Sequence, residues 1–292
     1  MLADFRLGLS KLIDLGNKMD INEVDALEYL MQDTETKAIF MHLEAVKGDP
    51  RRFFDILKIA VKSKPVVVLK GGRTAQGAKA VITHTGSIVS GNTAVFDSAL
   101  KQVGAISADT LDDFLYYAKA FTYLLPLKGN RVALATFPGG EAVLAVDACV
   151  QNGLVVAEPG TSTYEKLRPV VFPPWEILLN PFDFGIAYTF HTMQNNHGIF
   201  IEAMLEDDNV DCICLQLPPE MFPIDPPSFC APFLKAKERG KPLAVWPPYM
   251  LKFDGPVVKY LEENSVPVFP SAAIAIKSLA ALNAYHLYLQ AS

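Results

Sequence analysis

The sequence is poor in cysteine and has no excess of positive charge. Its 292 residues include four cysteines, and the formal net charge is −6 at pH 7. The absence of a basic cluster argues against a nucleic-acid partner, because binding to a phosphate backbone depends on Lys and Arg. The cysteines follow neither a zinc-ligand spacing nor a disulfide framework, so we expect buried, reduced thiols and no metal site. They are Cys149, Cys212, Cys214 and Cys230.

The sequence also lacks a long apolar run and a nucleotide-binding P-loop. No stretch stays apolar over the roughly 20 residues that cross a bilayer, and no signal peptide is recognisable, so we expect a cytoplasmic protein without a membrane partner. The segment from Gly72 to Lys79 imitates a P-loop. However, Ala78 separates Gly77 from Lys79, and neither Ser nor Thr follows the lysine. The Walker pattern is therefore not met.

The composition is that of a globular protein with two domains of ordinary size. Half of the residues are hydrophobic and a fifth are charged, which is sufficient for two cores. Strand-type and helix-type segments alternate along the chain, which predicts an α/β fold with two doubly wound, three-layer domains. A short linker at 125–129 places the boundaries at 1–126 and 127–292. Residues 33–44 and 207–218 resemble each other, as two copies of one unit would.

The apolar periodicity assigns an element to most of the chain. In the first half, strands are predicted at 9–15, 37–43, 66–69 and 105–107, and helices at 23–32, from 50, at 91–104 and at 110–123. In the second half, strands are predicted at 131–136, 154–157, 212–217 and 243–246, and helices at 141–152, 192–206, 231–239, 256–264 and 272–288. We expect loops at 158–185 and at 218–227, the latter because it holds five prolines.

A candidate anion site lies in residues 65–91. Val66–Leu69 is an apolar, β-branched run that ends at Gly71 and Gly72, which predicts a buried parallel strand. We expect a polar loop containing His84 to follow, and a helix to begin near Gly91. Such a strand, glycine-rich loop and helix N-terminus would bind an anion through backbone N–H groups and the helix dipole. Histidine in that loop would be a nucleophile beside a phosphate pocket.

Two other segments are expected at the same edge of the sheet. Ligands of doubly wound domains bind outside the carboxyl ends of the parallel strands. Glu44 follows the predicted strand at 37–43, and Gly16 and Asn17 follow the one at 9–15. In the second half, Gly139 and Gly140 form either a tight strand-to-helix turn or a second anion site. We favour the turn, because no nucleophile accompanies it.

Four motifs resemble those of the NDP-forming acyl-CoA synthetases: 15–20 (LGNKMD), 42–44 (HLE), 68–74 (VLKGGRT) and 83–87 (THTGS). The ADP-forming acetyl-CoA synthetases are the most similar group, and the succinyl-CoA synthetase alpha subunits are more distant. The resemblance covers nearly the whole chain and implies flavodoxin-like domains. It also implies an acid–CoA ligase, which interconverts acyl-CoA, nucleoside diphosphate and phosphate with acid, CoA and nucleoside triphosphate.

The resemblance assigns roles to the candidate residues. His84 matches the phosphohistidine of the family, and Glu44 matches the glutamate that holds its imidazole. A histidine with a pKa of about 6.5 is mostly a neutral nucleophile at pH 7, and a carboxylate on one ring nitrogen stabilises the charged product. Arg73 could bind phosphate bidentately or form a structural salt bridge. The predicted phosphate ligands are Gly71, Gly72, Arg73, Thr85, Gly86, Ser87 and Asn17.

Two domains of the family have no counterpart in the sequence. These are the CoA-binding Rossmann domain and the ATP-grasp domain, so we expect other domains or subunits to supply them, within an oligomer. Coenzyme A and a nucleoside di- or triphosphate with Mg would be substrates, and no prosthetic group is expected. Ala45 and Ala142 replace glycines of the family pattern. Two alternatives remain open: a non-catalytic regulatory or CoA-linked binding module, and an acyl transferase that uses CoA without nucleotide.

Overall fold

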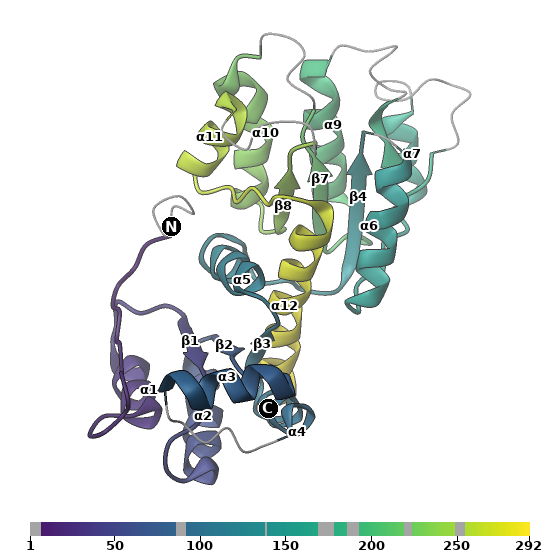
Figure 1. Ribbon diagram of the computed structural model, residues 1–292. Helices are drawn as coiled ribbons and strands as arrows, with labels where there is room; N and C mark the ends of the chain where they lie inside the picture. The colour runs from purple at the N-terminus through teal and green to yellow at the C-terminus, as the bar shows by residue number, and fades with distance from the viewer. Residues whose placement is uncertain are drawn as a thin grey trace. The chain divides into compact units, whose positions relative to one another are not determined.

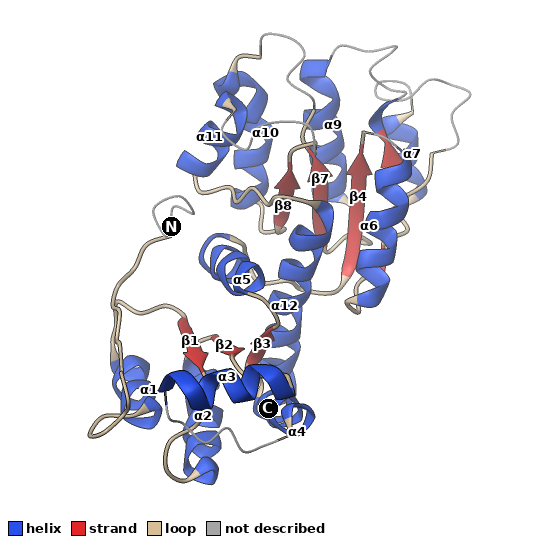
Figure 2. Cartoon of the chain, in the orientation of Figure 1, coloured by secondary structure: helices blue, strands red, loops and turns tan. Residues whose placement is uncertain are grey.

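The structure of the protein is a computed structural model. The structure describes residues 7–85, 92–137, 139–168, 178–185, 193–218, 224–248 and 255–292, without the side chains of 84, 85 and 193–195. The chain forms two compact units (Figure 1). Unit 1 comprises Met1–Thr122 and Ala284–Ser292, and unit 2 comprises Tyr123–Asn283. Each contains a parallel sheet between helices, which confirms the predicted α/β class (Figure 2).

The sheet of unit 1 has the order β1-β2-β3, with all its strands parallel. The strands are β1 (Ile39–Leu43), β2 (Val66–Lys70) and β3 (Ile106–Ala108). The helices of unit 1 are α1 (Glu23–Gln32), α2 (Pro50–Ser63), α3 (Ala75–Thr85), α4 (Thr93–Val103) and α5 (Leu111–Tyr123). Side chains of β1 and β2 pack with those of α1, α2 and α4 into one apolar core.

Local capping groups set the helix boundaries of unit 1. The Asn22 side chain accepts a hydrogen bond from the Val24 N–H at 2.8 Å and begins α1, and Asp49 caps α2 directly before Pro50. Asn92 caps α4, which ends at Gly104 in the left-handed conformation (φ 80°). These are the residue types that stabilise helix ends. The predicted helices at 23–32 and from 50 are confirmed, whereas α4 begins two residues after Gly91.

Two predictions for unit 1 are wrong. The segment at 9–15 is no strand, because none of the described strands lies within hydrogen-bonding reach of it. The polar loop after β2 is instead largely the helix α3, since the Thr74 hydroxyl accepts a hydrogen bond from the Gly77 N–H at 3.0 Å and caps its first turn. Within α2, the apolar side chain of Ile59 is 56% exposed.

The sheet of unit 2 has the order β5-β4-β7-β8, and β6 pairs with β4 in parallel. Its strands are β4 (Arg131–Thr136), β5 (Val155–Val156), β6 (Phe182–Asp183), β7 (Cys212–Gln216) and β8 (Leu243–Trp246). Its helices are α6 (Gly139–Gln151), α7 (Thr161–Leu167), α9 (Met193–Glu206), α10 (Pro226–Glu238) and α11 (Pro256–Glu263); the last helix, α12 (Ala272–Ala291), also contributes its final residues to unit 1.

Unit 2 corrects two loop predictions and confirms the state of the thiols. Residues 158–185 contain α7 and β6, and α10 begins at Pro226 because Asp225 caps it and proline fits the first turn of a helix. The remaining predicted proline loop, 219–223, lies outside the described residues. All four cysteines are free and buried. None of the helices in the described part of the chain combines the length and apolar character that crossing a bilayer requires.

Candidate functional site

Three loops of unit 1 meet at the carboxyl edge of its sheet. The Lys18 ammonium donates a hydrogen bond to the Ala45 carbonyl at 2.7 Å and lies 3.0 Å from the buried Glu23 carboxylate. The Gly71 N–H donates to the Leu43 carbonyl at 2.7 Å. The loops after residue 15, after β1 and after β2 are therefore tied together. This geometry brings Asn17, Glu44 and Gly71 to one edge.

Lys70 is a cation at this edge that the predicted site residues do not include. Its ammonium donates hydrogen bonds to the carbonyls of Glu44 at 2.6 Å and Gly71 at 2.5 Å, and lies 6.0 Å from the centre of the Phe96 ring. Burial lowers the pKa of Lys70, as do the positive charges of Arg73 and Lys18, whereas Glu44 raises it. The position of Lys70 at the end of β2, directly before the glycines, is the signal that could have revealed it.

The turn between β2 and α3 supplies the backbone of the site. Gly72 has φ +68°, a conformation that glycine adopts without strain, and a Cβ there would lie 3.2 Å from Val81. Thr74 then caps α3, so the first N–H groups of that helix follow the turn immediately. The combination of strand, glycine turn and helix N-terminus exists as predicted, but the helix is α3 and not the later one.

The structure places His84 in the last turn of α3, not in the glycine-rich loop. The prediction of a loop at His84 is therefore wrong, because residues 75–85 continue as a helix from the Thr74 cap. The side chains of His84 and Thr85 lie outside the description, as do Gly86 and Ser87 entirely. The histidine that the structure does describe at this edge is His42, whose side chain is exposed. Its Nε2 atom lies 3.6 Å from where a Cβ on Gly71 would be.

Arg73 is held in an ion-pair cluster. Its guanidinium donates two hydrogen bonds to the Asp97 carboxylate, at 2.5 and 3.2 Å, and lies 3.7 Å from Asp109. It also contacts the Ser107 hydroxyl at 3.5 Å. This bidentate geometry occupies the face that would bind a phosphate. Of the two interpretations left open for Arg73, the contacts favour the structural salt bridge.

The corresponding edge of unit 2 is filled by a hydrogen-bond network. Gly139 and Gly140 are the first two residues of α6. The Glu141 carboxylate accepts hydrogen bonds from Gln216 at 2.6 Å and from Trp246 at 2.7 Å. The side-chain oxygen Oε1 of Gln216 in turn accepts a hydrogen bond from the Phe137 N–H at 2.7 Å. The network holds the ends of β4, β7 and β8 together.

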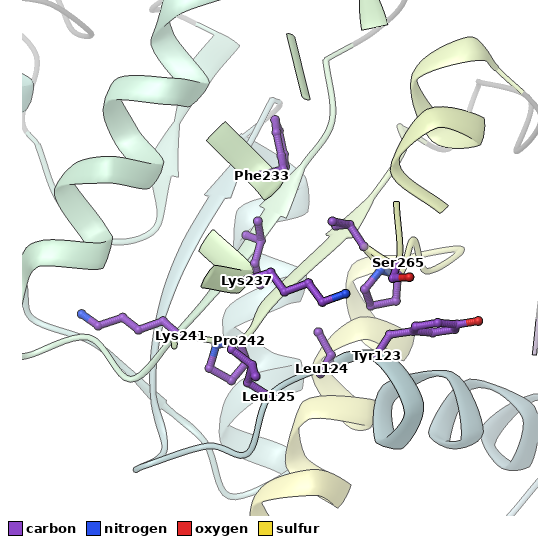
Figure 3. A pocket seen from close by; sticks show the side chains of 11 residues that line it. Tyr123, Leu124, Leu125, Phe233, Lys237, Lys241, Pro242 and Ser265 are labelled. Carbon is purple, nitrogen blue, oxygen red and sulfur yellow. The ribbon is translucent and has the colours of Figure 1, made fainter. Parts of the chain in front are cut away.

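A small cavity lies at the opposite, amino end of β8. Its volume is about 20 Å³, and Tyr123, Lys237, Pro242 and Ser265 are among its lining residues (Figure 3). Such a volume accommodates about one water molecule. Lys241 points away from the cavity in Figure 3 and donates hydrogen bonds to the carbonyls of Met204 and Asp207. The cavity is too small for a substrate of the predicted size.

Comparisons with known proteins define the class of the first unit. Residues 1–121 match the family model of the succinyl-CoA ligase like flavodoxin domain. In a structure of the Ca. Korarchaeum cryptofilum dinucleotide forming acetyl-coenzyme A synthetase 1 in complex with phosphate and ADP, the similar region covers 99% of this chain and 62% of that one, with a TM-score of 0.84 and 27% identity. The likeness therefore extends through both units.

The curated relatives narrow the assignment further. The alpha subunit of the ADP-forming acetate–CoA ligase II of Pyrococcus furiosus is 34% identical over 268 residues, which are 90% of this chain and 56% of that subunit. The ADP-forming 4-hydroxybutyrate–CoA ligase of Nitrosopumilus maritimus is 38% identical over 192 residues, 65% of this chain and 27% of that protein. The chain belongs to the NDP-forming acyl-CoA synthetase family, as its motifs indicated. It spans about half the length of the alpha subunit.

Proposed function

We propose that this chain is the part of an ADP-forming acid–CoA ligase that carries the phosphorylated histidine, His84. The observation that supports this most directly is the convergence of Glu44, Gly71 and Lys70 with the glycine turn at the carboxyl edge of the sheet. A partly buried ammonium and backbone N–H groups stabilise the negative charge of a reacting phosphoryl group, and a carboxylate can hold the imidazole that attacks it. The resemblance of the motif at 83–87 to the histidine motif of the family supports the same chemistry.

In the proposed reaction, phosphate first displaces CoA from an acyl-CoA and gives an acyl phosphate. A ring nitrogen of His84 then attacks the phosphorus, the bond from phosphorus to the acyl oxygen breaks, and the acid leaves as its carboxylate. Glu44 accepts a hydrogen bond from the other ring nitrogen and stabilises the positive charge of the phosphohistidine. An oxygen of the nucleoside diphosphate finally attacks the phosphorus and restores neutral His84.

The substrates and partners of the complete enzyme follow from the relatives. Coenzyme A, phosphate and a magnesium-bound ADP or ATP are the proposed substrates. The binding sites for CoA and nucleotide are assigned to other domains or subunits, because the chain spans only part of a relative that is itself named an alpha subunit. Acetate and 4-hydroxybutyrate, which occur in the names of the relatives, define the proposed acid class as short carboxylates.

The experiment is phosphorylation of the chain with acetyl phosphate, followed by intact mass measurement and peptide mapping at neutral pH. We expect one acid-labile phosphate on His84, lost in His84→Ala and retained in His42→Ala. His42 is the matched control, because it is exposed at the same edge beside Gly71. Phosphate that is lost only in His42→Ala would move the nucleophile to His42. No phosphate on either histidine, even with the remaining subunits supplied, would favour the regulatory-module alternative.

A further inference from the structure

A large groove runs along the outer edge of the unit 1 sheet. Its volume is about 600 Å³, and it separates β1 from residues 7–15, which we call the N-terminal segment. Figure 2 shows this segment as a loop beside β1. Helices α1 and α5 supply the other walls, through Leu27, Leu30, Phe114, Leu115 and Phe121 among others. The lining is therefore mostly apolar, and an aqueous groove of this kind is unfavourable.

The groove exposes a row of backbone hydrogen-bonding groups. Strand β1 is at the end of the sheet. On the side of β2, the Ile39 N–H donates to the Pro65 carbonyl at 2.9 Å, and the Leu43 carbonyl accepts from the Gly71 N–H at 2.7 Å. Alternate residues of a parallel strand bond to opposite sides. Phe40 and His42 therefore direct their N–H and C=O groups toward the groove. None of the described strands pairs with this edge.

The N-terminal segment runs parallel to β1 and is tied at both ends. The Ser10 hydroxyl lies 2.9 Å from the Thr36 hydroxyl, and Lys11 forms an ion pair with Asp33, so this end lies near the start of β1. Just beyond the segment, Lys18 donates to the Ala45 carbonyl, which follows the end of β1. The segment thus has the direction and length of a neighbouring strand, and its residues 9–15 have a strand pattern, but it pairs with none of the described strands.

We propose that the groove binds one β-strand, parallel to β1, that pairs with β1 on one side and with residues 9–15 on the other. The strand is supplied by the portion of the family's alpha subunit that this chain does not span. Because α1 and α5 would cover both of its faces, the strand must be apolar on both faces. Its binding would convert an open edge of the sheet into a continuous ladder.

The source of the strand follows from two observations. The match to the P. furiosus subunit covers 56% of that subunit, so a large part of it is not represented in this chain. A second copy of this chain is a poor occupant on the ground of strand direction. A twofold pair of β1 edges would run antiparallel, whereas the strand pattern on both walls of the groove is parallel.

The test uses the full 292-residue chain and, as the probe, the part of the P. furiosus subunit that lies outside the 268 matched residues. Native mass spectrometry measures the stoichiometry, and hydrogen exchange measures the protection of backbone amides. We expect a 1:1 complex in which exchange slows by about tenfold or more at residues 9–15 and at Phe40 and His42. The Ala118→Arg variant places a charge in the groove and should abolish both effects.

The matched control is Leu111→Arg, since Leu111 lies on the same helix, is exposed and does not line the groove. We expect this variant to bind the probe normally. Thermal unfolding of both variants shows whether they remain folded. Absence of the complex, or a complex without protection at residues 9–15 and 39–43, would overturn the proposal. Protection of these amides in the chain without the probe would also overturn it. Protection that depends on protein concentration would indicate self-association. Protection that is independent of concentration would indicate that the N-terminal segment closes directly onto β1.

Discussion

Arg73 lies beside the glycine turn, and its two possible roles are to form a structural salt bridge and to bind phosphate. Its bidentate pair with Asp97 is partly buried, so we expect Arg73→Ala and Asp97→Ala each to lower the free energy of unfolding by about 1 kcal/mol. Both variants should bind inorganic phosphate as the wild type does, because the guanidinium is already occupied. Urea unfolding and isothermal titration with phosphate measure the two effects. A phosphate affinity that falls in Arg73→Ala and rises in Asp97→Ala would instead identify Arg73 as a ligand.

Lys70 is expected to provide charge at the same edge. We expect its ammonium to make a charge-assisted hydrogen bond to the transferring phosphoryl group, worth about 1.5–3 kcal/mol, so Lys70→Met should slow phosphorylation of His84 by acetyl phosphate roughly ten- to a hundredfold. Burial and the positive charges of Arg73 and Lys18 lower the pKa of Lys70. The wild-type rate should therefore decline as pH rises through that lowered pKa, whereas the Lys70→Met rate lacks this decline.

Lys47→Met is the control for Lys70, because its side chain is exposed in the neighbouring loop. Its phosphorylation rate and pH profile should match those of the wild type. Equal losses in both variants would mean that the positive charge acts through the general field of the surface and not through the contacts of Lys70.

At the scale of elements, Asp207 connects α7 to the segment that follows α9. Its carboxylate accepts hydrogen bonds from the Thr163 hydroxyl at 2.6 Å, the Gly160 N–H at 2.7 Å and the Asn209 N–H at 2.8 Å. Burial raises the pKa of Asp207, but these hydrogen bonds and the charge of Lys241 lower it by more. A lowered carboxyl pKa contributes stability above the unfolded pKa of about 3.9, and this stability is lost as pH falls through the folded pKa.

We expect Asp207→Asn to lower the free energy of unfolding of unit 2 by about 1–3 kcal/mol at pH 7. The variant should also lose less stability than the wild type when the pH falls below about 4. Urea unfolding at a series of pH values measures both effects. Asp208→Asn is the control, because Asp208 is exposed, and its curves should follow the wild type. Parallel pH curves for wild type and Asp207→Asn would contradict the argument.

The elements also show which predictions depended on local chemistry. The helices at 23–32 and from 50 were predictable because Asn22, a capping residue type, and Pro50, which suits a first helical turn, mark their beginnings in the sequence. Helix α3 was missed because its cap, Thr74, stands among residues that also suit a loop, and because Gly77 weakens the helical pattern. Gly77 packs closely against Gly72: a Cβ added at position 77 would lie 3.3 Å from the Cα of Gly72. The packing that stabilises α3 is thus not visible in its own sequence.

At the scale of the whole molecule, the end of α12 belongs to unit 1 although it follows unit 2 in the chain. The Tyr285 hydroxyl donates to the Val61 carbonyl at 3.0 Å, and its ring contacts Phe121 with a centroid distance of 5.8 Å. Tyr288 packs on Gly104, where a Cβ would lie 2.2 Å from the tyrosine ring. A boundary at residue 126 therefore assigns these last residues to a different unit from the one they stabilise.

We expect Tyr285→Ala to lower the stability of unit 1 by about 2 kcal/mol, from lost packing and one lost hydrogen bond. The unfolding of unit 2 should not change. Hydrogen exchange of amides in α2 and in β7 reports on the two units separately. His286→Ala serves as the control, because His286 is adjacent and contacts Gln290 on the exposed side of the helix. Equal losses of protection in both units would show that they unfold as one cooperative unit.

The sequence by itself determined the parallel α/β class, most element positions, the buried free thiols and the family. These properties follow from periodicity, capping residues and short motifs, each of which acts over a few neighbouring positions. Only the tertiary structure decided that Arg73 pairs with Asp97, that Lys70 joins the Glu44 and Gly71 carbonyls, and that residues 9–15 pair with none of the strands it describes. Ion pairs and strand pairing join residues that are distant in sequence, and a strand pattern forms a strand only where a neighbouring backbone offers its hydrogen bonds.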